Sequence, residues 1–353
     1  MSNVRRLRHH WVAVLLALFL GVLFMLPFVA IRMQLGEGFK GIVPEISADD
    51  YFYSARVQDV LDGHPFIGNP YLWEHENDPP QQVFLAEFLL AQPLRFLGLR
   101  AVEGRILYAF ILPIIAFLLA YMAFYRVGKS RFWAVVIVSF LFFFLQPFKF
   151  LRPVSPQFNF IFWLTLTLIL WEIIEGNRSR RLIILGALNF AFLFYIYPYY
   201  WAYYTILFVL LCGIYFFTER KLTFPLAAIL VGGFLGGSWY FYYTYQASHL
   251  PWYEDSLTRL GMIYSHFPSG ILVFAACVPI LFLYAIALKT KIIKWRAETI
   301  FMVASLVAVI IAVNAHVIVG KNMHFAAHYY PLAYFIAALA GIYFLRFIPF
   351  DWL

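Results

Sequence analysis

The sequence predicts an all-α polytopic membrane protein with about ten transmembrane helices. Hydrophobic residues make up 63% of the 353 residues and charged residues only 12%, whereas soluble domains are about half apolar and a quarter charged. The apolar residues recur in runs of about 16 to 22, each long enough to cross a hydrocarbon core of about 30 Å as a helix. A water-soluble fold is therefore excluded, and residues 1–353 are expected to form a single transmembrane domain.

The first apolar run follows a basic amino-terminal cluster and superficially resembles a secretory signal. It extends from Trp11 to about Ile31, which is longer than the apolar region of a signal peptide, and no small-residue cleavage site follows it. We therefore expect a retained first helix. The ten expected spans are residues 11–31, 105–125, 132–147, 158–174, 182–198, 199–217, 222–244, 270–288, 299–317 and 330–346.

The count of ten depends on one narrow connection. Only residues 197–200 separate the fifth and sixth runs, so this pair could also form a re-entrant segment. A count of eight to eleven is compatible with the pattern.

Basic residues are divided unevenly between the two sets of connecting loops. With both termini in the cytoplasm, the cytoplasmic segments hold 16 of the 26 basic and 5 of the 18 acidic residues. The positive-inside rule selects this orientation. Topology thus accounts for the net charge of +8, and no nucleic-acid partner is needed. We expect a plasma (inner) membrane protein whose active site lies on the external or periplasmic side.

A long external loop is expected between the first and second spans, at residues 32–105. It holds 11 of the 18 acidic residues, and a charged connection of this length is rarely passive. Ser47 and Asp50 fit a capping box at the start of a helix that Gly63 would end. This helix has an apolar and a charged side, which is typical of an interfacial helix.

A second juxtamembrane amphipathic helix is expected in the same loop. Pro79 and Pro80 precede the segment 81–92, and Pro93 is expected to stop it. At a dozen residues it is too short to span the bilayer. We therefore expect it to lie at the membrane surface.

Asp49 and Asp50 stand at the start of the first loop helix and allow two interpretations. Acidic residues in a first turn complement the helix dipole and cap free amides, with no chemistry implied. A carboxylate held beside the bilayer could also accept a proton from a sugar hydroxyl or bind a hard divalent cation. The sequence alone leaves both interpretations open.

The segment from Asp50 through the aromatic run Tyr51–Tyr53 to Arg56, in a long loop after the first span, resembles the GT-C membrane glycosyltransferases. These include oligosaccharyltransferase catalytic subunits, protein O-mannosyltransferases and aminoarabinose transferases. The resemblance implies a first external loop with two juxtamembrane helices and a catalytic or metal-binding acid. It assigns the role of this acid first to Asp50 and second to Asp49, which could also bind a divalent cation (Mg²⁺ or Mn²⁺). It adds Arg56 as a candidate for binding the substrate.

The resemblance covers about the first 130 residues, and two departures from the family pattern are visible. The Trp-Trp-Asp-Tyr-Gly signature of oligosaccharyltransferases is absent, which argues against asparagine glycosylation. The chain also ends at Leu353 soon after the last span, so we expect either a compact member or a chain without its carboxy-terminal part.

Other binding candidates lie in two further external segments. Arg152 and Gln157 occupy a proline-containing turn, where a guanidinium could bind a lipid phosphate or simply anchor the chain at the lipid headgroups. Lys321, His324, His328 and Tyr329 occupy the last external loop. In the resembled superfamily a basic and aromatic cluster in a late loop contacts the lipid phosphate, although an ordinary interfacial belt would have the same composition.

Three functions remain after the sequence has been read. The first is a glycosyltransferase that moves a sugar from a polyprenyl-phosphate donor lipid to a glycan, lipid or protein acceptor. The alternative is a transporter or a lipid-linked glycan flippase, a class that favours charges within its spans and related halves. A non-catalytic assembly subunit is the third, if the two aspartates are only helix caps.

Overall fold

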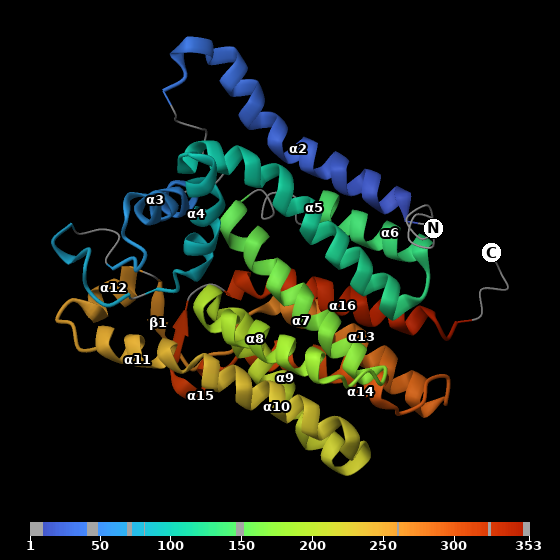
Figure 1. Ribbon diagram of the computed structural model, residues 1–353. Coiled ribbons are helices and arrows are strands. Elements are labelled where there is room, and N and C mark those ends of the chain that lie inside the picture. The colour runs from blue at the N-terminus through green and yellow to red at the C-terminus, as the bar shows by residue number, and fades with distance from the viewer. Residues whose placement is uncertain are drawn as a thin grey trace. The chain divides into compact units, whose positions relative to one another are not determined.

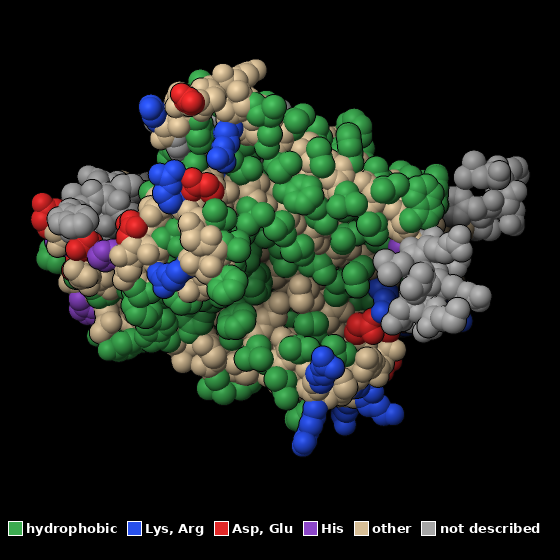
Figure 2. Space-filling model, turned by 45° about the horizontal axis from the view of Figure 1, so that its top comes forward, with side chains coloured by type: hydrophobic (Ala, Val, Ile, Leu, Met, Phe, Trp, Pro, Cys, Tyr) green, Lys and Arg blue, Asp and Glu red, His purple; other side chains and the backbone are tan. Residues whose placement is uncertain are grey.

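The computed structural model is almost entirely helical and describes residues 10–40, 49–68, 73–80, 82–145, 152–259, 261–323 and 326–348. Hydrophobic side chains cover most of the surface visible in Figure 2, and charged side chains gather in a few groups. A surface of this kind is typical of a protein whose solvent is lipid. The chain is therefore an all-α membrane protein.

Among the described residues, eight helices are long and apolar enough to cross a membrane. They are Trp11–Gly38, Ala101–Gly128, Pro153–Ile174, Pro198–Thr218, Arg220–Ala247, Ile271–Lys289, Ala297–Val319 and Ala326–Leu345.

The predicted total of ten spans is not confirmed, because two of the expected helices are short. The third expected span forms a helix over Arg131–Leu145. The fifth forms α8 (Arg180–Ile196) with 17 residues, or about 26 Å at 1.5 Å per residue. Eight lies within the range that the pattern allows.

The chain folds as two compact units. Unit 1 comprises residues 1–122 and 134–164, and unit 2 comprises residues 123–133 and 165–353. The elements of unit 1 in chain order are α2 (Trp11–Leu35), η1 (Gly36–Gly38), α3 (Asp49–Asp62), η2 (Trp73–His75), α4 (Leu85–Leu97), most of α5 (Ala101–Gly128), most of α6 (Arg131–Phe140), η3 (Leu141–Leu145), η5 (Pro153–Phe158) and the start of α7 (Asn159–Ile174).

In unit 1 the first membrane helix, α2, runs alongside α5 (Figure 1). The buried ring of Phe28 packs on Ala109, and partly buried side chains of α5 surround this contact. A Cβ at Gly21 would lie 2.7 Å from the carbonyl oxygen of Phe110. The glycine therefore permits a close approach of the two backbones, and this packing holds the first half of α5 against α2.

The first loop helix, α3, matches the predicted segment except at its start. It begins at Asp49, and Ser47 of the predicted capping box lies outside the described residues. At the other end Gly63 adopts φ +112°, as expected for the residue that terminates a helix. Val57 and Val60 are buried, and α3 packs against α4.

The prediction that Pro93 ends the second loop helix is wrong. Helix α4 runs from Leu85 to Leu97 with Pro93 inside it. Gly98 ends the helix in the left-handed region at φ +66°, with its N–H bonded to the carbonyl of Arg95. Proline removes one helical hydrogen bond, and the packing of α4 against α3 together with this glycine cap outweighs that loss.

Unit 2 is built from the remaining helices and one small sheet. Its elements after the end of α7 are α8, α9 (Pro198–Thr218), α10 (Arg220–Gly236), α11 (Ser238–Ala247), α12 (Tyr253–Arg259), β1 (Met262–Tyr264), α13 (Ile271–Lys289), α14 (Ala297–Val313), α15 (His316–Val319), β2 (Lys321–Met323), η6 (Ala326–His328) and α16 (Tyr330–Leu345).

Small residues let the helices of unit 2 pack closely. A Cβ at Gly233 of α10 would lie 2.1 Å from the ring of Phe190 on α8, so the two helices are in direct contact. Helix α9 packs against α10 and α14, and α13 packs against α16. The sheet pairs β1 with β2 in antiparallel register, Tyr264 opposite Lys321, and brings together two connections that the sequence treats as separate loops.

Candidate functional site

The candidate site is a pocket in unit 1 with a volume of about 380 Å³, including the part that is open to solvent. Three helices supply most of its wall, each through one face. The lining residues are Asp50, Tyr53, Ser54 and Val57 from α3, Leu90 and Leu94 from α4, Ala101, Arg105 and Tyr108 from α5, and Arg152, Pro153 and Val154 from the turn before α7.

The spacing of the lining residues explains why these side chains meet. On α3 they stand at positions i, i+3, i+4 and i+7, and on α5 at i, i+4 and i+7, spacings that place side chains on one face of a helix. Gly104 helps to bring α5 close to α4, because a Cβ there would lie 2.3 Å from the Leu94 side chain. The pocket therefore follows from the helical periodicity of its three walls.

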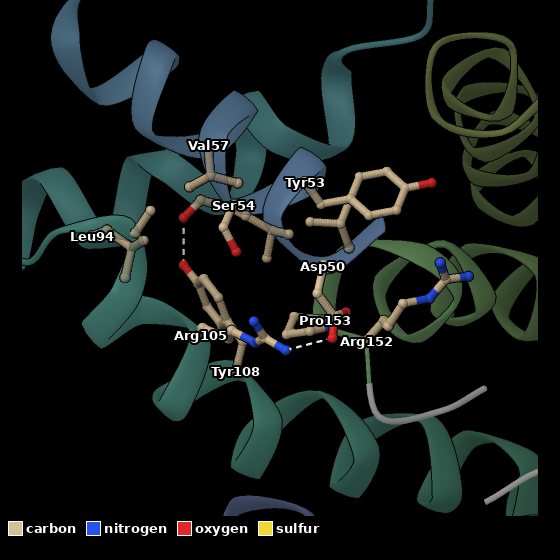
Figure 3. Close-up of a pocket in the computed structure, with 12 residues that line it drawn as sticks. Asp50, Tyr53, Ser54, Val57, Leu94, Arg105, Tyr108, Arg152 and Pro153 are labelled. Atoms are coloured by element: carbon tan, nitrogen blue, oxygen red, sulfur yellow. Dashed lines mark hydrogen bonds and ion pairs between the residues drawn. The ribbon is translucent and has the colours of Figure 1, made fainter. Parts of the chain in front are cut away.

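An ion pair between Asp50 and Arg105 lies inside the pocket. Nη2 of Arg105 donates to Oδ2 of Asp50 at 2.6 Å (Figure 3), and each residue is only 3% exposed. The ring of Phe28 lies 4.9 Å from the guanidinium carbon, within cation–π range. Fifty-five residues of sequence separate the two partners, so tertiary packing alone brings them together.

Arg152 and Asp49 form a second ion pair at the edge of the pocket. The Asp49 side chain is 58% exposed and the Arg152 side chain 15% exposed, so solvent screens this pair more than the first. Arg152 also lies over the ring of Tyr53, 5.8 Å from its centre. The predicted residues Asp49, Asp50 and Arg152 therefore lie in one place.

The remaining polar side chains of the pocket are hydroxyl groups. Tyr108 donates to the carbonyl of Leu90 at 2.5 Å, which ties α5 to α4, and Ser54 also lines the pocket (Figure 3). Burial raises the pKa of Tyr53, and the neighbouring Arg152 guanidinium opposes that shift. Tyr53 therefore stays a neutral phenol near pH 7.

Arg56 lies on another side of α3 and joins it to α4. Its Nε donates to Glu87 at 2.7 Å, its Nη1 to Gln82 at 3.3 Å and its Nη2 to the carbonyl of Val83. Arg56 is 2% exposed and Glu87 3% exposed. A substrate would have to displace one of these partners, so the role of Arg56 in substrate binding stays a prediction.

Gln157 lies near the site in sequence but does not line the pocket. It is fully buried in η5, at 0% exposed. Its predicted part in binding therefore also stays a prediction.

The predicted residues of the last external loop belong to unit 2. His328 stacks on Tyr199 with ring centres 4.4 Å apart, and its Nδ1 is hydrogen-bonded to the hydroxyl of Tyr197. Tyr329 meets Tyr199 edge-on at 5.3 Å. Lys321 lies in β2, with its ammonium group 5.8 Å from the ring centre of Tyr264. His324 lies outside the described residues.

The donors around the two aspartates do not by themselves form a cation site, and the divalent cation stays a prediction. Each carboxylate already faces a guanidinium group, whereas Mg²⁺ and Mn²⁺ favour sites rich in carboxylate, carbonyl and water oxygens. In the described ranges no group of three or more His, Cys, Asp or Glu residues could hold a metal ion.

Arg105 is the main site residue that was not predicted from the sequence. It was expected only as the first residue of the second span. One signal could have found it. In the sequence Arg105 is the first residue of an expected span, and basic residues within membrane helices are functional candidates by default.

Comparison with known proteins does not assign the chain to a family. No protein-family model, no curated protein and no solved structure matches the chain.

Proposed function

We propose that this chain is a membrane glycosyltransferase that moves a sugar from a polyprenyl-phosphate donor to a hydroxyl of a glycan, lipid or protein acceptor. The observation that carries the proposal is the Asp50 carboxylate, which is buried in a pocket beside Arg105 and close to Arg152. An acid of this kind can serve as a general base, and the cations and hydroxyl groups around it suit a phosphorylated sugar.

The position of the pocket along α5 agrees with a lipid-borne donor. This helix has 28 residues, or about 42 Å at 1.5 Å per residue. Arg105 lies near its first residue and Arg126 near its last. A prenyl tail stays in the bilayer and keeps its phosphate at the interface, which is the depth expected for the end of a spanning helix.

The proposed reaction is a displacement at the anomeric carbon of the donor sugar. Asp50 accepts the proton of the acceptor hydroxyl, and the oxygen of that hydroxyl forms the new glycosidic bond. The bond between the anomeric carbon and the prenyl phosphate breaks, and the phosphate leaves with the electron pair. Arg152, which lines the same pocket, would stabilise the negative charge that develops on the leaving group.

The residues of the last external loop remain candidates for the lipid phosphate. His328 and Tyr329 form an aromatic cluster with Tyr199, and Lys321 supplies a cation nearby in sequence. We propose them as secondary binding residues, to be tested after Asp50.

The test is sugar transfer by purified protein in liposomes, with the donor identified first by mass spectrometry of copurifying lipids. Asp50→Asn keeps a side-chain oxygen that can accept from Arg105 but cannot act as the base. We expect transfer to fall by about 100-fold or more. Asp50→Glu, which restores a carboxylate, should recover part of the activity.

Asp62→Asn is the matched control, because Asp62 lies on the same helix and is exposed. It should leave transfer unchanged. If the folded Asp50→Asn variant transferred sugar at the wild-type rate, Asp50 would not be the general base. Movement of the lipid across the bilayer without a new glycosidic bond would instead support the transporter or flippase alternative.

A further inference from the structure

The guanidinium group of Arg105 has hydrogen-bond donors that the protein does not use. Nη2 bonds to Asp50, but Nε and Nη1 are buried and have no hydrogen-bond partner among the described residues. Nε carries one N–H and Nη1 carries two. Buried donors are almost always paired, and an exception calls for an explanation such as a bound ion or water.

These donors belong to a residue that lines the pocket, and their surroundings favour an anion. Arg105 stands in the second turn of α5, one turn from the positive end of the helix dipole. Arg152 adds a second cation at the edge of the same pocket. Asp50 occupies only one nitrogen of Arg105, so an additional acceptor can bind without breaking that ion pair.

The ligand must offer several oxygen acceptors and no competing donor. A phosphoryl group meets this requirement, because its terminal oxygens accept bonds from a guanidinium fork. We propose that Arg105 anchors a phosphoryl-binding site in this pocket, with Nε and Nη1 as the donors. That the phosphate comes from a lipid rests on the proposed function. The binding of a phosphoryl group at Arg105 does not, and it can be measured without sugar transfer.

The first experiment measures binding by the full-length protein in detergent. Inorganic phosphate and farnesyl phosphate are titrated separately against the thermal unfolding midpoint, with chloride at equal ionic strength as the reference. We expect a saturable rise with both probes. Farnesyl phosphate should bind about tenfold or more tightly than inorganic phosphate if the site takes a lipid-borne group, because its tail adds apolar burial.

Equal affinity for the two probes would still support the site and would identify a soluble phosphate as its source. A wild-type protein that shows no saturable shift with either probe overturns the proposal.

The second experiment uses Arg105→Lys, which keeps the positive charge beside Asp50 but removes Nε and the planar fork. We expect phosphate affinity to fall by about tenfold or more. Arg100→Lys is the control, since Arg100 is an exposed arginine just before the same helix and is paired with Glu103, and its phosphate affinity should match the wild type. Equal binding by Arg105→Lys and wild type overturns the proposal.

A third variant keeps the proposal testable if Arg105→Lys does not fold. Asp50→Asn removes a negative charge that repels an anion beside Arg105, so phosphate affinity should increase while sugar transfer falls by about 100-fold or more. A decrease in phosphate affinity would overturn the binding site and leave the transferase proposal in place. If the wild-type protein binds phosphate but transfers no sugar, the binding site stands and the transferase proposal is rejected.

Discussion

Two arginines of unit 1, Arg56 and Arg105, have nearly the same surroundings but use their hydrogen-bond donors differently. Both are almost fully buried, at 2% and 3% exposed, and each is paired with one carboxylate. Each also lies over a phenylalanine ring, at 5.1 Å from Phe52 and 4.9 Å from Phe28. Burial and charge pairing therefore do not distinguish them.

The difference lies in how many guanidinium nitrogens have acceptors. Arg56 donates from all three nitrogens, to Glu87, Gln82 and Val83, whereas in the described part of the chain Arg105 donates from Nη2 alone. A guanidinium whose donors are all used holds two elements together. One with unused donors beside a pocket retains the capacity to bind a ligand.

The largest expected effect comes from removing the charge of Arg56. Arg56→Met leaves Glu87 buried without a cation, so the free energy of unfolding should fall by about 3–5 kcal/mol. Denaturant titration of the detergent-solubilised protein measures the change.

Two further variants control that measurement. Arg56→Met combined with Glu87→Leu should recover most of the loss, because replacing a whole buried pair by apolar side chains is often neutral. Arg100→Met removes an exposed arginine and should cost less than about 1 kcal/mol. A loss for Arg56→Met no larger than that of Arg100→Met would refute the joining role of Arg56.

A smaller effect should separate the two arginines directly. Arg56→Lys keeps the charge but gives up acceptors at Gln82 and Val83, so we expect a loss of about 1–3 kcal/mol. Arg105→Lys gives up donors that have no acceptor among the described residues, so its unfolding free energy should stay within about 1 kcal/mol of the wild type. If the two lysine variants lost the same unfolding free energy, Arg56 and Arg105 would not differ in how they use their donors.

The smallest effect is expected at the exposed ion pair of Asp49 with Arg152. Asp49→Asn should change the free energy of unfolding by less than about 1 kcal/mol, because solvent screens a pair at the surface. Unfolding at low and at high salt measures it, and the difference should shrink at high salt. A loss above about 1 kcal/mol that does not shrink at high salt would mean that solvent does not screen this pair.

The sequence predicted the fold class because hydropathy alone decides whether a helix can lie in lipid. It leaves the number of spans between eight and eleven, since α8 falls at the lower length limit and packing, which hydropathy does not record, determines where a helix ends. The prediction at Pro93 failed for a similar reason. One proline removes one hydrogen bond, and the contact of α4 with α3 outweighs it.

The sequence could single out Asp49 and Asp50 because they stand at an expected helix start, and Arg152 because it lies in a turn between two apolar runs. It could not pair Asp50 with Arg105, because that contact spans 55 residues and depends on the docking of α3 and α4 at the start of α5. Arg56 illustrates the same limit. Its place in a short motif suggested contact with a substrate, whereas its partners within the described residues belong to the neighbouring segment before and within α4.

The ring of Phe28 gives the first membrane helix an influence on chemistry that its composition conceals. One face of the Arg105 guanidinium is covered by this ring, whose electron-rich surface favours the cation and offers it no acceptor. Replacing Phe28 with leucine would keep the helix apolar and still alter how strongly the neighbouring charge attracts an anion. Substitutions of apolar residues in α2 can therefore change the affinity of Arg105 for an anion without changing any polar atom.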